Sequence, residues 1–142
     1  MPRPTASVVP LAARTGARRS RARLRTATPA DAPALHALIT ANLEEGRLLP
    51  RTLPELVARA SRFVVATRGD AVVGCAELAP LSPQVAEVRS LAVDRNERGS
   101  RIGVAIVEEL RRRARQGGFD KLCAFTHAPA YFSRMGFSIV PH

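Results

Sequence analysis

Glycine and arginine residues gather where one helix is expected to begin. The run Arg98-Gly99-Ser100-Arg101-Ile102-Gly103-Val104-Ala105 leads into a segment with helical spacing of apolar residues. The first turn of a helix exposes backbone N–H groups without partners, and the positive end of the helix dipole lies there. Such an end can receive a pyrophosphate, although glycine and arginine before a helix are also typical of an ordinary loop.

The cysteines and histidines do not indicate a metal or disulfide site. Cys75 and Cys123 each lie in an apolar run, without another Cys or a His at metal-ligand spacing. We therefore expect two core thiols, no metal, and a reducing cytoplasmic compartment. His36 is expected on a helix surface, and His142 is the last residue.

Two capping signals define the expected N-terminal helices. Thr28, followed by Pro29 and Asp31, predicts a helix over residues 29–43 with one apolar stripe. Thr52 and Glu55 repeat the cap and open a short second helix.

The rest of the sequence predicts strands with one long helix among them. Arg68-Gly69-Asp70 separates two strand-like runs and predicts an antiparallel hairpin. A strongly amphipathic helix begins near Ile102 and stops at Gly117-Gly118. The expected strands are a first one near residue 24, then 63–67, 71–78, 87–93, 121–126 and 137–140, and a short helix covers 130–135.

Length and charge narrow the class of protein. The chain has 142 residues and a net charge of +10, which fits one domain. The first 25 residues hold seven Arg and no acid, so the basic charge lies mostly in a tail, residues 1–23, that we expect to be disordered. We therefore expect no nucleic-acid partner from the charge, and no apolar run is long enough to cross a membrane.

From residue 24 to the end the chain resembles the GCN5-related N-acetyltransferases (GNAT). The resemblance rests on four segments at that family's spacing: 88–93, 94–97, 98–105 and 132–137. It implies a mixed α/β fold with a central sheet and about four helices, and acetyl-CoA as cosubstrate. It also implies pantetheine contacts from Leu91, Ala92 and Val93, and pyrophosphate contacts from Arg98 through Ala105.

Three features depart from the family pattern. Arg101 stands where the family's turn usually has glycine, so its bulk could weaken the phosphate cradle or its guanidinium could add a cation to it. The family's acidic Tyr would fall at Phe132, with Tyr131 one place early, so no Tyr general acid is assigned. The sequence stops soon after Val140, where the family usually continues into one more strand, so we expect either a truncated protein or another cover for that edge, such as a homodimer partner.

Within the family, four segments resemble the acetyltransferase domain of N-acetylglutamate synthases, including their short single-domain form in arginine biosynthesis. These segments are 43–52, 73–76, 87–93 and 125–126. The resemblance implies L-glutamate as acceptor, bound by Arg51 and by the backbone of Leu49 and Ser90. A dicarboxylate needs such cations, because each carboxylate is costly to desolvate without a matching donor.

The resemblance also implies the catalytic groups. Glu87 would take the proton of the substrate ammonium through water, and Thr126 would lie beside the reacting groups. Arg89 shares a strand face with Glu87 by alternation and could help bind substrate, as could His127. Glu87 and Arg89 can also be read as ordinary surface or ion-paired residues.

Two other functions stay open at this point. One is an acetyltransferase of another small amine or of a protein N-terminus. The other is a degenerate acetyltransferase fold that binds RNA or DNA through the Arg-rich tail.

Overall fold

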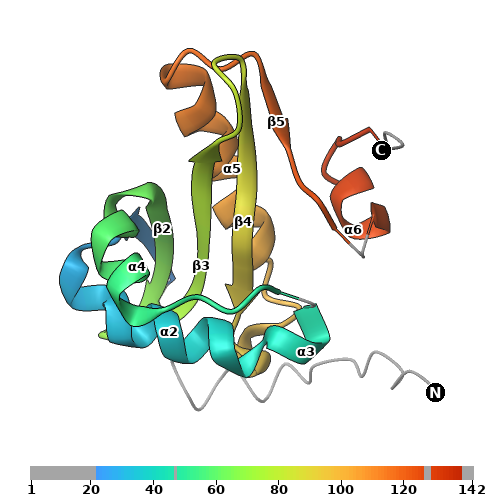
Figure 1. The fold of residues 1–142 in the computed structure, drawn as a ribbon. Coiled ribbons are helices and arrows are strands. Elements are labelled where there is room, and N and C mark those ends of the chain that lie inside the picture. The colour runs from blue at the N-terminus through green and yellow to red at the C-terminus, as the bar shows by residue number, and fades with distance from the viewer. Residues whose placement is uncertain (1–21, 47, 127–128, 139–142) are drawn as a thin grey trace.

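The structure is a computed structural model that describes residues 22–46, 48–126 and 129–138. Figure 1 shows a sheet with helices on both faces. The elements, in chain order, are β1 (Arg23–Thr26), η1 (Pro29–Asp31), α2 (Ala32–Ala41), α3 (Leu43–Gly46), α4 (Leu53–Arg59), η2 (Ala60–Arg62), β2 (Phe63–Arg68), β3 (Ala71–Pro80), β4 (Val85–Val93), η3 (Arg95–Glu97), α5 (Ile102–Gln116), β5 (Lys121–Cys123) and α6 (Pro129–Ser133).

The strands form one mixed sheet in the order β1-β2-β3-β4-β5. Neighbours from β1 to β4 are antiparallel, and β4 pairs with β5 in parallel. The hairpin expected around residues 68–70 is confirmed, because Arg68 pairs with Ala71 across Gly69, whose φ is 59°. A positive φ is a conformation that glycine adopts without steric cost. The mixed α/β fold implied by the resemblance is therefore present.

Alternation along the strands gives the sheet two apolar faces. Phe63, Val65 and Cys75 point to one face and form a core with α2 and α4. Val64 and Ala66 point to the other face and pack with the apolar stripe of α5. Figure 1 shows α2 and α4 on the near side of the sheet and α5 behind it.

A bulge interrupts β4 at its centre. Cys75 pairs with Ala92 and Glu77 pairs with Arg89, so β4 carries one residue more than β3 between these pairs. Ser90 lies there with a φ of 55°, in the left-handed region that non-glycine residues rarely adopt. Such a bulge bends the strand and changes where its side chains point.

The N-terminal helices begin at the expected caps but have different lengths. Thr52 Oγ1 accepts a hydrogen bond from the Glu55 N–H at 3.3 Å, and Glu55 Oε1 accepts one from the Thr52 N–H at 3.2 Å. The helix expected over 29–43 is instead η1, α2 and α3 in succession. Its first turn is a 3₁₀ turn, in which the Thr28 N–H donates to Asp31 Oδ2 at 2.7 Å.

Some expected boundaries are wrong. β1 begins at Arg23, which was placed in the tail, and β5 ends at Cys123 rather than Thr126. β5 is short because its pairing with β4 stops at Glu87 and Cys123. Phe137 and Ser138 are not in a strand, and the rest of the expected last strand lies outside the described residues.

Among the described residues, no helix is both long and apolar enough to span a bilayer. The same part of the chain brings together no group of three or more His, Cys, Asp or Glu residues that could hold a metal ion.

Close packing between β3 and α5 leads to a stability prediction. A Cβ added at Gly74 would come within 2.9 Å of both Ile102 Cγ2 and Ile106 Cδ1, which are buried. Gly74→Ala should therefore lower the free energy of unfolding by about 1–3 kcal/mol, because overpacking strains a dense core. Urea unfolding measures the change. Gly74→Val should cost more, and a neutral or stabilising effect of both variants would contradict the packing described.

Candidate active site

The turn before α5 has the backbone geometry of an anion cradle. Gly99 has a φ of 85°, and Arg101, the residue before α5, has a φ of 67°. Arg101 thus adopts the left-handed conformation that glycine prefers, in agreement with the family's usual glycine at this place. The Ser100 hydroxyl donates to the Glu97 carbonyl oxygen and closes the turn. The N–H groups of the first turn of α5 are left for a ligand.

A cavity of about 1090 Å³ lies beside this turn. Nine of the eleven residues predicted to contact the coenzyme line it, and Ser100 and Ala105 do not. The nine are Leu91, Ala92, Val93, Arg98, Gly99, Arg101, Ile102, Gly103 and Val104. The cavity is large enough for an extended ligand, because typical ligand pockets measure about 300–1,000 Å³.

One wall of the cavity comes from Asn42, which follows α2, and from α3, and this wall was not predicted. Asn42 Oδ1 accepts a hydrogen bond from Arg98 Nη2 at 2.8 Å, and Glu45 Oε1 lies 3.2 Å from the same nitrogen. The hydrogen bond from Arg98 lowers the pKa of the Glu45 carboxyl below its usual value. The exposed pair with Glu45 adds little stability, but together with the hydrogen bond to the buried Asn42 it holds the Arg98 side chain beside the cavity.

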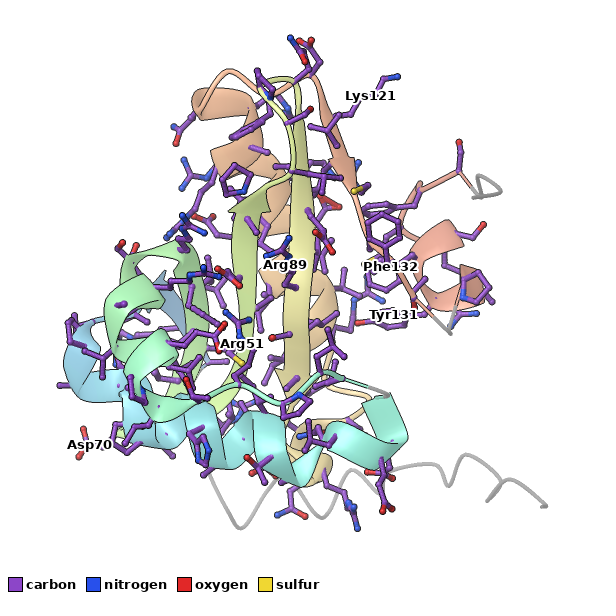
Figure 2. The ribbon with its side chains drawn as sticks, in the orientation of Figure 1. Arg51, Asp70, Arg89, Lys121, Tyr131 and Phe132 are labelled. Carbon is purple, nitrogen blue, oxygen red and sulfur yellow. The ribbon has the colours of Figure 1, made fainter. Side chains whose placement is uncertain are left out.

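The other wall comes from α6. Phe132 is buried, with its ring centroid 5.3 Å from that of Phe137, so no hydroxyl stands at the family's Tyr position. Tyr131 lines the cavity instead, and its hydroxyl lies where a Cβ on Gly103 would be. Partial burial raises the pKa of Tyr131, which keeps the phenol protonated at neutral pH. Figure 2 labels both rings, which extend from α6 toward the sheet.

A row of charged side chains lies on the sheet face that α2 and α4 partly cover. We call Arg51, Glu77, Arg89 and Glu87 the charged row. Glu77 and Arg89 are Cα partners across β3 and β4, and Arg89 Nε donates to Glu87 Oε1 at 2.9 Å. Figure 2 shows Arg51 and Arg89 in front of the same two strands. The structure therefore brings three predicted residues together and adds Glu77.

Arg51 is engaged inside the protein. Its Nη1 donates to Glu77 Oε1 at 2.9 Å and to Ser90 Oγ at 2.8 Å. Its Nε lies 3.0 Å from Glu55 Oε2, and its guanidinium lies over the ring of Phe63 at 5.5 Å. Only 7% of the side chain is exposed. The cation expected to meet a substrate carboxylate thus already has a carboxylate partner.

The remaining predicted residues lie around this face. Leu49 is 80% exposed and precedes Arg51 by two residues. Ser90 is half-buried at the bulge, and Thr126 is half-buried three residues after β5. His127 lies outside the described residues.

Both cysteines are poor nucleophiles in this structure. Cys75 is fully buried, and burial raises the pKa of its thiol to about 12. Cys123 is half-buried opposite Glu87, and burial followed by the charge of Glu87 raises its pKa as well. Neither is available as a thiolate at neutral pH. The core position expected for Cys75 fits this geometry, whereas Cys123 is only half-buried and lies outside the core clusters.

Thiol reactivity tests that assignment. At pH 8 the folded protein should label Cys75 with a disulfide reagent at least about a hundredfold more slowly than a free thiol, because the thiolate is the reactive form. The guanidinium-unfolded protein should label both Cys75 and Cys123 at once. Cys75→Ala identifies the slow site, and rapid labelling of Cys75 in the folded state would contradict its burial.

In this mixed sheet, the fourth strand and the start of the helix that follows it border one cavity. This arrangement defines a class of enzymes that bind a coenzyme at this position. The acetyltransferase (GNAT) family matches residues 29–137, and the chain belongs to this family. The resemblance seen in the sequence is thereby confirmed.

The relatives include amino-acid acetyltransferases. An uncharacterised N-acetyltransferase of Chlorobaculum tepidum, CT2212, is 31% identical over 114 residues, 80% of this chain and 74% of the relative. An amino-acid acetyltransferase of Mycobacterium tuberculosis is 34% identical over 119 residues, 81% of this chain and 67% of the relative. The amino-acid acetyltransferase of Pasteurella multocida is 30% identical, but the matched region covers only 27% of its length.

Solved structures give the same fold. Rv2747 of Mycobacterium tuberculosis, in complex with CoA and the ligand NLQ, has a TM-score of 0.79 and 32% identity over 84% of this chain and 73% of its own. The N-acetylglutamate synthase of Neisseria gonorrhoeae, complexed with coenzyme A and N-acetyl-glutamate, has a TM-score of 0.80 and 26% identity over 88% of this chain and 30% of its own. The protein is an acetyl-CoA-dependent N-acetyltransferase of the GNAT type.

Coenzyme binding yields a direct prediction. Millimolar acetyl-CoA should raise the melting temperature by several degrees, because a ligand that binds only the folded state stabilises it. An analogue without the pyrophosphate should raise it less, because the α5 N-terminus then has no anion. Gly103→Val should shrink the shift by placing a side chain in the cavity.

Ala58→Val serves as the matched control, because Ala58 is an exposed residue of α4, on the opposite face of the sheet. It should leave the shift unchanged. No shift of the unmodified protein, or an equal shift with the analogue, would contradict pyrophosphate binding at α5.

Proposed function

We propose that the protein transfers the acetyl group of acetyl-CoA to the amino group of L-glutamate, as an N-acetylglutamate synthase of arginine biosynthesis does. The observation that carries the proposal is the charged row, whose two carboxylates and two guanidinium groups lie along β3 and β4, close in sequence to the cavity residues Leu91, Ala92 and Val93. The names of the relatives in Mycobacterium tuberculosis and Neisseria gonorrhoeae support an amino-acid acceptor.

Glu87 is the proposed base. Its side chain is 12% exposed and its Oε1 is held by Arg89, so one carboxylate is fixed on the sheet face. An ammonium group has no lone pair, so it must lose a proton before it can attack a carbonyl carbon. Glu87 takes that proton, directly or through a water molecule.

The proposed coenzyme contacts lie along the second half of β4 and at α5. The ladder between β4 and β5 ends at Glu87 and Cys123, so the β5 side of residues 88–93 is free for a ligand in the described part of the chain. The amine attacks the thioester carbonyl carbon of acetyl-CoA; the C–S bond then breaks, and CoA leaves as a thiol after its sulfur takes up a proton from solvent. Backbone N–H groups of this edge can stabilise the oxyanion that forms at the carbonyl.

The other predicted residues complete the proposed site. Leu49 and Ser90 contact the acceptor through their backbone, Arg51 and Arg89 face its carboxylates, and Thr126 lies beside the reacting groups. His127, outside the described residues, stays a predicted substrate contact. A cytoplasmic location and a homodimer belong to the same proposal.

One observation favours a second candidate, an acetyltransferase of another small amine. The guanidinium of Arg51, which a dicarboxylate acceptor would need, already pairs with Glu77. An acceptor with fewer negative charges would need fewer cations in the site to balance its charge.

An acceptor panel with Glu87→Gln tests the proposal. The wild type should release CoA fastest with glutamate among the amino acids, and Glu87→Gln should lower kcat by about a hundredfold or more, because general-base catalysis is lost. The loss should deepen at lower pH, where water removes the amine proton least well. The KM for acetyl-CoA should hardly change.

Glu109→Gln is the control, because Glu109 pairs with Arg112 and Arg113 on the solvent side of α5. It should keep wild-type turnover. Faster turnover with a non-amino-acid amine would replace glutamate by that amine, and unchanged kcat in Glu87→Gln would exclude Glu87 as the base.

A further inference from the structure

Glu77 is a carboxylate in the middle of an apolar strand, and it is completely buried. Its side chain is 0% exposed, and its Oε1 accepts the hydrogen bond from Arg51 Nη1 at 2.9 Å. Among the described residues its Oε2 has no hydrogen-bond partner, and the nearest further cation is Arg62 Nη1 at 3.7 Å. Arg51 Nη2 is likewise buried without a hydrogen bond.

Such a pair is a poor way to stabilise a fold. Two charges lose their hydration when they are buried, and apolar residues of similar volume often stabilise a core at least as well. Two unsatisfied buried atoms make the arrangement costlier still. The pair therefore calls for an explanation beyond stability.

The position of Glu77 connects it to the acceptor. Its Cα partner is Arg89, whose guanidinium holds the proposed base Glu87, and its ion-pair partner Arg51 also binds Ser90. A substrate amine at Glu87 therefore brings the rest of the acceptor close to Glu77. Any second carboxylate of the acceptor then meets a negative charge in a region of low dielectric, where charges act strongly.

We propose that Glu77 is a specificity-determining residue of the acceptor site, which occupies Arg51 and weakens the preference for a dicarboxylate. The wild-type enzyme thus distinguishes only modestly between glutamate and glutamine, whose shapes are alike and whose charges differ. The assignment rests on the proposed function, because it concerns the acceptor of that same reaction.

The decisive variant is Glu77→Gln, which keeps the shape and removes the charge. The ratio of kcat/KM for glutamate to kcat/KM for glutamine should rise about tenfold, through a lower KM for glutamate. The kcat/KM for glutamine and the KM for acetyl-CoA should stay within about twofold of the wild type. A merely structural partner of Arg51 would change both acceptors alike.

Glu55→Gln is the matched control. Glu55 also contacts Arg51, at 3.0 Å, but lies at the start of α4 with about a third of its side chain exposed. Glutamine can keep the capping contact with Thr52. Solvent screens the lost charge, so the glutamate-to-glutamine ratio should not change.

A paired replacement covers the case in which Glu77→Gln does not fold, since it leaves Arg51 without its buried partner. Arg51→Gln alone should lower the glutamate-to-glutamine ratio, and Arg51→Gln with Glu77→Gln should return it to near the wild-type value. Equal ratios in the single Arg51→Gln variant and in the double variant would overturn the assignment of Glu77 without affecting the proposed function. An unchanged ratio in Glu77→Gln would do the same. A wild type that acetylates neither amino acid would overturn the proposed function, and the assignment with it.

Discussion

Strand β4 pairs with β3 from Ala86 to Val93 on both sides of the bulge, but with β5 only as far as Glu87 and Cys123. This partial pairing is the constraint on which the site depends. The second half of β4 keeps one edge open, and that edge borders the cavity. The first half carries Glu87 and Arg89 on the face of the charged row. A single strand thus brings the proposed coenzyme and acceptor contacts within a few residues of each other.

The bulge in β4 and the start of α5 fix how the proposed coenzyme contacts lie relative to the proposed acceptor contacts. Ser90 has a positive φ at the bulge, and its hydroxyl oxygen accepts a hydrogen bond from Arg51. The strand therefore bends where the two halves of the site meet. Because Gly74 has no side chain, Ile102 and Ile106 approach β3 closely, and this contact sets the distance between α5 and the sheet. The first turn of α5 then lies beside the open edge of β4, with its N–H groups available to a ligand.

Local signals explain how much of this could be predicted from the sequence. The cap at Thr52, the hairpin around Gly69 and the amphipathic stripe of α5 depend on neighbours in the chain, and the structure contains all three. The nine predicted coenzyme contacts that line the cavity come from two short segments, 91–93 and 98–104, which is why sequence motifs could point to them.

What the sequence did not predict depends on contacts between distant residues. The end of β5 at Cys123 follows from where β4 stops pairing, and the Asn42 contact joins residues 56 positions apart. Glu77 was overlooked although it left one signal, a lone carboxylate inside the apolar run Ala71–Pro80. A strand of that composition is expected to be buried, so the carboxylate had to have a cation partner in the fold.

The identity of that partner changes how Arg51 is understood. An arginine near an acceptor site suggests a binding cation when it is considered alone, because a guanidinium matches a carboxylate in shape and charge. In the structure the Arg51 side chain is 7% exposed, and its guanidinium contacts Glu77, Glu55 and Ser90. Among the described residues, its removal would leave the buried Glu77 with only the more distant Arg62, at 3.7 Å. Breaking a buried ion pair by removing one partner typically costs about 3–5 kcal/mol. Loss of activity in an Arg51 variant would therefore report on the fold as well as on the acceptor, and only replacements that treat Arg51 and Glu77 as one unit separate the two effects.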